Sequence, residues 1–304
     1  MRVVIVGGGV GGLALAGGLR AAGAEAVVLE RHDGPDPGGA AVTIFSNGAA
    51  ALEGLGAGLG DRGAAIAALE IRRASGGLAL RTDLTRLSRR FGFGVRTVPR
   101  RVLLDHLGAG DRDVVRYGRQ VVAVRADRPA VQTADGEVHE GDVVVGADGH
   151  RSVVRAAVLG PAPAANVGWT TWQGLTPVLP DLAGRHTGVL TVGPAGLVGT
   201  MPAGGGLCQW WFDVPAETVD AIAPLDRLRS AFSGYAEPVP SLLDSIGAQD
   251  LARFGHVVHR VEARWGTGPT TLIGDAAHVF PPSQAQGANQ AIEDAWLLTA
   301  ALVA

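Results

Sequence analysis

The chain begins with a pattern of apolar and polar positions that predicts a strand, a helix and a second strand. Residues 2–6 (RVVIV) form a short apolar run, as expected for a strand buried on both faces. After a glycine-rich turn, a helix is predicted from the apolar residues Leu13, Leu15, Ala16 and Leu19. A second strand is predicted within residues 24–31 (AEAVVLER) and ends in Glu30. This order is typical of an α/β fold with a parallel sheet.

The middle of the chain predicts further short strands and helices. Residues 98–107 (VPRRVLLDHL) predict a helix entered after Pro99. The stretch that follows alternates as short strands with a turn at Asp135-Gly136, and its last apolar run leads into Gly-Ala-Asp-Gly and a helix with Ser152 and Arg155. Later strands are predicted at 168–178, 186–203 and 207–214, as a separate sheet.

The turn after the first strand has the spacing G-x-G-x-x-G at Gly7, Gly9 and Gly12. Glycine serves a tight turn, close approach of the backbone to a pyrophosphate, and close packing of helix on strand. The helix that follows points its free N–H groups at the phosphates. Glu30, eighteen residues past Gly12, is placed to accept hydrogen bonds from ribose hydroxyls; the alternative is a solvated acid at a strand end. The pattern predicts a dinucleotide site without distinguishing FAD from NAD.

Composition narrows the kind of partner. The 304 residues are 47% hydrophobic and 18% charged, with a formal net charge of -3, which favours a small, partly apolar ligand over a nucleic acid. The single cysteine, Cys208, excludes an intrachain disulfide framework and a cysteine-built zinc site, and it fits a reducing cytoplasm. No uninterrupted apolar segment reaches about 18 residues, so no membrane span is predicted.

Four motifs together resemble the FAD-dependent aromatic hydroxylases, the single-component flavoprotein monooxygenases of the para-hydroxybenzoate and salicylate hydroxylase type. They are the glycine motif, RRVLLDHL (100–107), GADGHRSVVR (146–155) and GDAAHVFPPSQAQGANQAIEDA (274–295). The resemblance covers nearly the whole chain. It implies an α/β fold with a discontinuous, doubly wound, Rossmann-like FAD-binding domain and an inserted mixed β-sheet substrate domain. The implied FAD-binding domain comprises residues 1–70, 96–165 and 265–304, and the implied substrate domain comprises residues 71–95 and 166–264.

The resemblance implies FAD as the cofactor and NAD(P)H as a transient electron donor. In this family the reduced flavin reacts with O2, and a flavin C4a-hydroperoxide hydroxylates or epoxidises an electron-rich aromatic or polyketide-like small molecule. Two alternatives stay open: a non-catalytic FAD- or ligand-binding protein, and another FAD oxidoreductase such as a double-bond reductase. No ionisable pair stands out in the sequence as general acid and base, so no catalytic residue is assigned.

The resemblance also assigns cofactor contacts. Arg100 would lie near the phosphates or the ribityl chain, and Asp148 would support the pyrophosphate region, although Asp148 is equally suited to cap a helix. Asp275 would accept a hydrogen bond from a ribityl hydroxyl. The last helix, beginning near Gly287, would aim its free N–H groups at the pyrimidine edge of the flavin. The full expected set is Gly7, Gly9, Gly12, Glu30, Arg31, Arg100, Asp148, Asp275, Pro282, Gly287, Ala288 and Asn289.

Substrate contacts are expected on the separate sheet, which in this family roofs the flavin. Strand alternation places Leu207, Gln209 and Trp211 on one face and Cys208, Trp210 and Phe212 on the other. We expect Gln209 and Trp211 to line the substrate pocket; the alternative for the tryptophans is core packing. His278 is expected to belong to the scaffold of its motif.

Two departures from the family pattern bear on these expectations. Where the family's loop usually reads Gly-Gln-Gly, this chain has Ala285-Gln286-Gly287. If that position needs a positive φ, alanine costs about 1 kcal/mol there. Relatives also usually continue for several more helices after the one that begins near Gly287.

Overall fold

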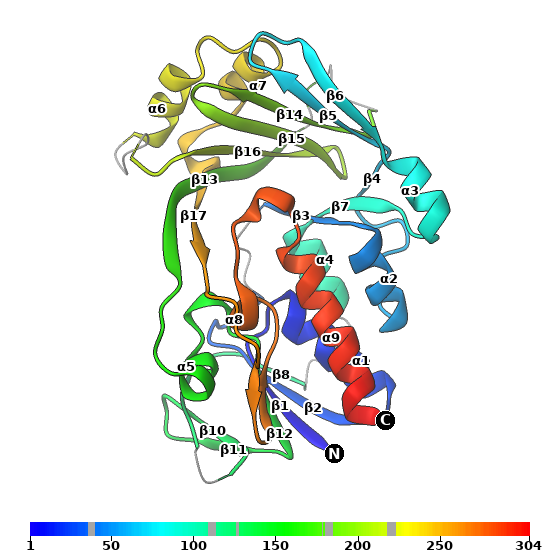
Figure 1. Ribbon diagram of the computed structural model, residues 1–304, viewed down its shortest axis with the longest axis vertical. Helices are drawn as coiled ribbons and strands as arrows, with labels where there is room; N and C mark the ends of the chain where they lie inside the picture. The colour runs from blue at the N-terminus through cyan, green and yellow to red at the C-terminus, as the bar shows by residue number, and fades with distance from the viewer. Residues whose placement is uncertain (36–39, 109–113, 126–127, 178, 180–184, 218–222) are drawn as a thin grey trace.

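The computed structural model describes residues 1–35, 40–108, 114–125, 128–177, 179, 185–217 and 223–304. Figure 1 shows two main β-sheets, one above the other, connected by the long strands β13 (Ala165–Pro177) and β17 (Ala252–Val258). Both chain termini lie near the lower sheet. Each of the two sheets is built from strands that are far apart in the sequence.

The lower sheet has six strands in the order β18, β19, β12, β1, β2, β8. All neighbours from β19 to β8 pair in parallel, whereas the short edge strand β18 pairs antiparallel. Because the carboxyl ends of parallel strands meet at one edge, Gly7, Glu30, Ala147 and Ile273 gather there. The strands are β1 (Arg2–Val6), β2 (Glu25–Leu29), β8 (Val115–Arg116), β12 (Val143–Gly146), β18 (Gly266–Thr267) and β19 (Thr270–Leu272).

Alternation along β1 divides the core around this sheet into two layers. Val3 and Ile5 pack with residues of α1 (Val10–Ala21), α2 (Ser46–Gly54), α4 (Arg100–Leu107) and α9 (Gly287–Val303). Val4 and Val6 pack with residues of α5 (Val153–Leu159), α8 (Asp275–His278) and the strands β9 (Val121–Val124) and β10 (Ala130–Thr133) in the opposite layer. Strand β11 (Val138–Glu140) pairs with β10. Coverage of both faces explains why β1 reads as a continuous apolar run.

The upper sheet has seven strands in the order β17, β13, β16, β15, β14, β5, β6. Only the β14–β5 pair is parallel among these described strands, so the sheet is mixed. On one face, Trp210, Phe212 and Phe232 form a chain of edge-to-face contacts beneath the two covering helices. The remaining elements are β5 (Ala68–Arg73), β6 (Leu78–Asp83), β14 (Thr187–Gly193), β15 (Gly196–Gly204), β16 (Leu207–Pro215), α6 (Pro224–Ala231) and α7 (Val239–Ser245).

A small antiparallel sheet lies between the two large ones (Figure 1). Its strands are β3 (Ala41–Ile44), β7 (Val95–Pro99) and β4 (Ala64–Ile66), and α3 (Leu84–Phe91) precedes β7. Short 3₁₀ turns occur at Gly149–Arg151, Ala248–Asp250 and Pro282–Gln284. The expected fold class, a parallel α/β unit with an inserted mixed sheet, is confirmed, whereas the exact domain boundaries stay a prediction.

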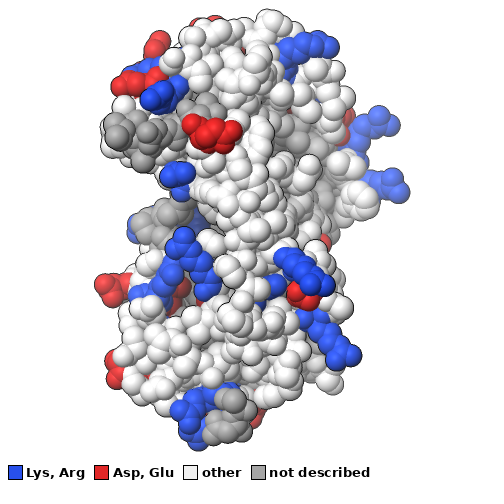
Figure 2. Space-filling model, turned by 60° about the vertical axis from the view of Figure 1, so that its left-hand side comes forward, with Lys and Arg blue, Asp and Glu red and all other residues white. Residues whose placement is uncertain are grey.

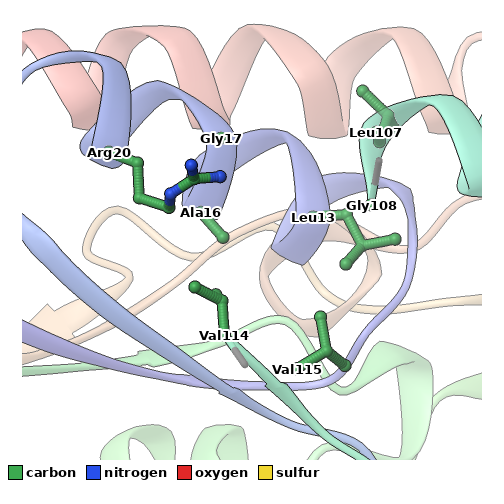
Figure 3. A pocket seen from close by; sticks show the side chains of 8 residues that line it. All are labelled: Leu13, Ala16, Gly17, Arg20, Leu107, Gly108, Val114 and Val115. Atoms are coloured by element: carbon green, nitrogen blue, oxygen red, sulfur yellow. The ribbon is translucent and has the colours of Figure 1, made fainter. Parts of the chain in front are cut away.

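The surface carries small groups of charged side chains and a small recess. On the face seen in Figure 2, acidic and basic side chains lie in small separate groups with uncharged surface between them. Figure 3 shows a recess where Leu13 and Ala16 of α1 face Val114 and Val115; its volume of about 20 Å³ has room for roughly one water. No described helix is long and apolar enough to span a membrane.

Candidate active site

The glycine turn after β1 has the geometry that a phosphate-binding turn requires. Gly7 has φ +108°, and a Cβ there would lie 2.4 Å from the carbonyl oxygen of Ala147. A Cβ at Gly12 would lie 2.0 Å from the carbonyl oxygen of Gly7. At Gly9, by contrast, a Cβ would meet no described atom within 4 Å. Gly7 and Gly12 are thus required by the fold itself, while Gly9 borders space that a ligand can fill.

Glu30 lies beside this turn at the carboxyl end of β2. Its side chain is buried and accepts hydrogen bonds from the backbone N–H of Gly8 (2.6 Å) and of His32 (3.0 Å). The His32 ring also contacts Glu30, with Nδ1 2.7 Å from Oε1. Arg31, the next residue, is exposed. The carboxylate therefore orders the glycine turn, and its expected hydrogen bonds to a ribose stay a prediction.

Asp148 lies just after β12, where its carboxylate faces the first turn of α5. It accepts hydrogen bonds from Ser152 Oγ (2.5 Å) and from the backbone N–H of Val153 (2.8 Å). Burial raises the pKa of Asp148, although these hydrogen bonds oppose the shift. The carboxylate thus accepts from the first turn of α5, although the N-cap residue of that helix is Ser152, and the cofactor role of Asp148 stays a prediction.

Arg155 links this helix to the next motif, a role that the sequence did not reveal. Its buried guanidinium donates through Nη1 to the carbonyl oxygens of Ala276 (3.0 Å) and Ala277 (2.7 Å). The GADG motif and the GDAA motif are therefore fixed to each other through α5 and α8. Carbonyl groups at the end of a short helix need such donors when they are buried.

Asp275 lies in front of the amino end of α9. A Cβ at Gly287, the first residue of α9, would be 3.8 Å from Asp275 Oδ1. Burial raises the pKa of Asp275, while the nearby positive charges of His150, His278 and Arg100 act to lower it. The expected neighbours Asp275, Gly287 and Arg100 are thus brought within electrostatic range of one another.

Asp294, on α9, fixes the backbone around Asp275. Its Oδ2 accepts hydrogen bonds from the backbone N–H of Gly274 (2.8 Å) and from His278 Nε2 (2.7 Å). Gly274 has φ +57°, a conformation that favours glycine. Burial lowers the pKa of His278, but the hydrogen bond and charge of Asp294 outweigh it, so the net shift is upward. His278 therefore acts in the scaffold of the motif, as expected.

Ala285 adopts the left-handed conformation, with φ 50° and ψ 32°. Ala285 therefore has the positive φ at which alanine costs about 1 kcal/mol relative to glycine. The fully buried side chain of Asn289 holds the loop: its Nδ2 donates to the carbonyl oxygens of Ala285 and Thr43, both at 2.9 Å. Its Oδ1 accepts from the Phe45 N–H at 2.9 Å. The Asn289 side chain is therefore committed to the protein, and any contact with a cofactor falls to its backbone.

A cavity of about 900 Å³ lies between the loop before α9 and the upper sheet. Its loop side includes Asp275, Pro282, Gly287 and Ala288, all expected cofactor contacts. Its sheet side includes Gln209 and Trp211, the two expected substrate contacts, with Gln209 Nε2 donating to the carbonyl oxygen of Ala41 at 3.2 Å. The remaining expected residues, Gly7, Gly9, Gly12, Glu30, Arg31, Arg100, Asp148 and Asn289, do not line this cavity.

An ionisable pair that the sequence did not reveal is present in the same cavity. Thr171 Oγ1 is hydrogen-bonded to Asp213 Oδ1 and lies 2.7 Å from His256 Nε2. The three residues come from β13, β16 and β17, so they meet only through strand pairing. Asp213 and His256 are thus a pair that spacing along the sequence could not reveal, and no catalytic role is assigned to either.

Comparisons with known proteins agree with this arrangement. A family model described as an FAD binding domain matches residues 1–304. Aurachin C monooxygenase/isomerase of Stigmatella aurantiaca is 33% identical over 99% of this chain and 80% of its own length. The 3-amino-4-hydroxybenzoate 2-monooxygenase PtmB3 of Streptomyces platensis is 36% identical over 98% of this chain and 78% of its own.

Solved structures show the same likeness in three dimensions. The crystal structure of Klebsiella pneumoniae HpxO complexed with FAD and uric acid superimposes with a TM-score of 0.92, at 29% identity, over 99% of this chain and 79% of that one. The expectation of FAD as the cofactor is therefore confirmed. The cavity between loop and sheet, the glycine turn and these matches lead to one conclusion: the chain belongs to the FAD-dependent aromatic hydroxylase family of flavoprotein monooxygenases.

Proposed function

We propose that this protein uses NAD(P)H and O2 to hydroxylate or epoxidise an electron-rich aromatic or polyketide-like small molecule. The observation that carries the proposal is the 900 Å³ cavity, because its wall is shared by the Asp275–Ala288 segment and by the substrate-facing side of β16. A flavin ring on the loop side would face a substrate on the sheet side within this one cavity. Cavities of this size are typical of small-molecule sites.

The residues present fit FAD. Gly9 borders open space at the amino end of α1, where free N–H groups favour phosphate. Asp275 and the first residues of α9 would hold the ribityl chain and the pyrimidine edge. Bound FAD would supply the transfer of electrons from NAD(P)H and the activation of dioxygen.

The chain's own contribution is electrostatic and steric. The amino end of α9 carries partial positive charge, which would stabilise negative charge on an adjacent ring. Trp169, Trp211, Leu190 and Phe254 give the sheet side of the cavity an apolar lining. Substrates named for the relatives, aurachin C, 3-amino-4-hydroxybenzoate and urate, are aromatic rings, which supports the same class here.

The test is substrate-stimulated oxidation of NADPH by the FAD-loaded protein, measured together with oxygen uptake over a panel of aromatic and polyketide-like phenols. The proposal predicts that at least one ring accelerates both signals in parallel. Stimulated NADPH oxidation without oxygen uptake would indicate a reductase, and tightly bound FAD without turnover would indicate a binding protein. We also propose a cytoplasmic location, supported by the single buried cysteine.

A further inference from the structure

The cluster of Thr171, Asp213 and His256 forms a polar patch in an otherwise largely apolar part of the cavity. Thr171 and His256 are each less than a tenth exposed, and Asp213 has a side-chain exposure of 15%. The Thr171 hydroxyl can accept from His256 Nε2–H and donate to Asp213 Oδ1, and Nε2 also lies 3.6 Å from that oxygen. Asp213 Oδ2 accepts no hydrogen bond from the described residues. One carboxylate oxygen is thus fixed and the other is available to a ligand.

The position of the patch follows from strand register. On β16, Gln209, Trp211 and Asp213 point to the same face, so Asp213 lies about 13 Å along the strand from Gln209. Trp211 lies between them and packs over Gly199, where a Cβ would be 2.1 Å from the indole ring. An aromatic ligand that rests against Trp211 would therefore have Asp213 at one end and Gln209 at the other.

Apart from one histidine, the ionisable side chains of the described cavity wall are carboxylates. Its described lining contains two carboxylates, Asp213 and Asp275, and one histidine, His256, but no arginine or lysine. A carboxylate on the ligand would find no arginine or lysine on this wall, and beside Asp213 it would be repelled by a like charge. A ligand N–H or O–H group, in contrast, would give Asp213 Oδ2 a charge-assisted hydrogen bond.

We infer that Asp213, oriented by Thr171 and His256, determines the substrate class: an aromatic ring that carries amino or hydroxyl donors and lacks a carboxylate. The inference rests on the proposed function, because it assigns the sheet side of the cavity to the ring that is oxidised. It also separates this chain from relatives that act on a ring acid, such as the 3-amino-4-hydroxybenzoate monooxygenases.

Three small rings test the inference by direct binding to the FAD-loaded protein, followed through the absorbance of the bound flavin. They are 2-aminophenol, its fully N- and O-methylated counterpart without donors, and 3-amino-4-hydroxybenzoate, which adds only a carboxylate. The natural protein should bind 2-aminophenol more tightly than either of the others. Asp213→Asn should weaken binding of 2-aminophenol by about tenfold or more, should leave the methylated ring within about twofold, and should strengthen binding of the ring acid.

The matched control is Asp226→Asn, the same substitution on the exposed surface of α6, which should change none of the three affinities. Equal affinity of the natural protein for the three rings, absence of 2-aminophenol binding, or an unchanged ring preference in Asp213→Asn would overturn the inference. Retention of FAD and the melting temperature show that the variant is folded. If the ring preference switches while no phenol in the turnover panel stimulates oxygen uptake, the proposed function fails, and Asp213 selects a ring that binds in the cavity without being oxidised there.

Discussion

Gly9 and Gly12 stand three residues apart in one motif, the first before α1 and the second within it, and they have different neighbours. A side chain at Gly12 would collide with the backbone of Gly7, whereas a side chain at Gly9 would enter space that no described residue occupies. Both are glycine positions of the G-x-G-x-x-G motif, so the sequence alone does not distinguish their roles. The structure separates a glycine that the fold requires from one beside which the described residues leave open space.

This difference gives a test of the cofactor site by paired substitutions. Gly9→Ala should leave the stability of the FAD-free protein within about 0.5 kcal/mol, because its φ of -79° suits alanine, but should lower FAD affinity by about tenfold or more. Gly12→Ala should cost more than about 2 kcal/mol through its clash. Gly17→Ala, in the same helix with open space around it, is the control and should stabilise by about 0.5–1 kcal/mol. Urea unfolding and FAD titration measure both quantities, and normal FAD affinity in Gly9→Ala would contradict the assignment.

Ala285 tests the strain in the loop before α9. At φ 50° a β-branched residue is far less tolerated than alanine, so Ala285→Val should destabilise the protein by about 2 kcal/mol. Ala300→Val, at an exposed position of α9, should cost only about 0.5 kcal/mol from helix propensity. Equal losses in urea unfolding for the two variants would mean that the loop relaxes to another conformation.

At the scale of elements, α8 and α9 are coupled through one carboxylate. Asp294 of α9 bonds both the backbone of Gly274 and the ring of His278, so the turn that carries Asp275 is held from the helix it faces. Asp294 belongs to a motif that the sequence identified, but its partners lie 20 and 16 residues earlier in the chain. Only the packing of α9 beside α8 shows what it holds.

The coupling predicts a pH-dependent stability difference. Because the net pKa shift of His278 is upward, the folded state binds its proton more tightly than the unfolded state does. The associated stabilisation is fully present below the unfolded pKa of about 6.5 and is lost as the pH rises through the folded value. Asp294→Asn should therefore lose more unfolding free energy at pH 6 than at pH 9, as measured by urea denaturation. A loss that is the same at both pH values would show that His278 does not gain a proton from this contact.

Some elements of the fold and the site can be predicted from the sequence, and others cannot. The apolar run of β1, the helix after Pro99 and the start of α9 near Gly287 were predictable, because each depends on local spacing and on glycine or proline. The alternation along β16 likewise predicted that Trp210 and Phe212 share a face. The cluster of Thr171, Asp213 and His256 was not predictable, because it depends on the register of three strands that are distant in sequence.

At the scale of the whole molecule, the loop before α9 and the sheet that carries β16 line one cavity. The lower sheet supplies the edge at which the glycine turn, Glu30 and Asp148 gather, and the upper sheet supplies an apolar wall with a polar end at Asp213. β13 and β17 run between the two parts, so the same strands that carry Thr171 and His256 also join the sheets (Figure 1). Cofactor and substrate would therefore meet in a space that neither part forms alone.

The central claim is that an oxygen atom from O2 is transferred to a ring in this cavity. The FAD-loaded protein, NADPH and a ring that stimulates oxygen uptake should be incubated under isotopically labelled dioxygen, and the product analysed by mass spectrometry. The account predicts a product that carries one labelled oxygen atom. A product without label, or one labelled only when the label is supplied as water, would contradict it.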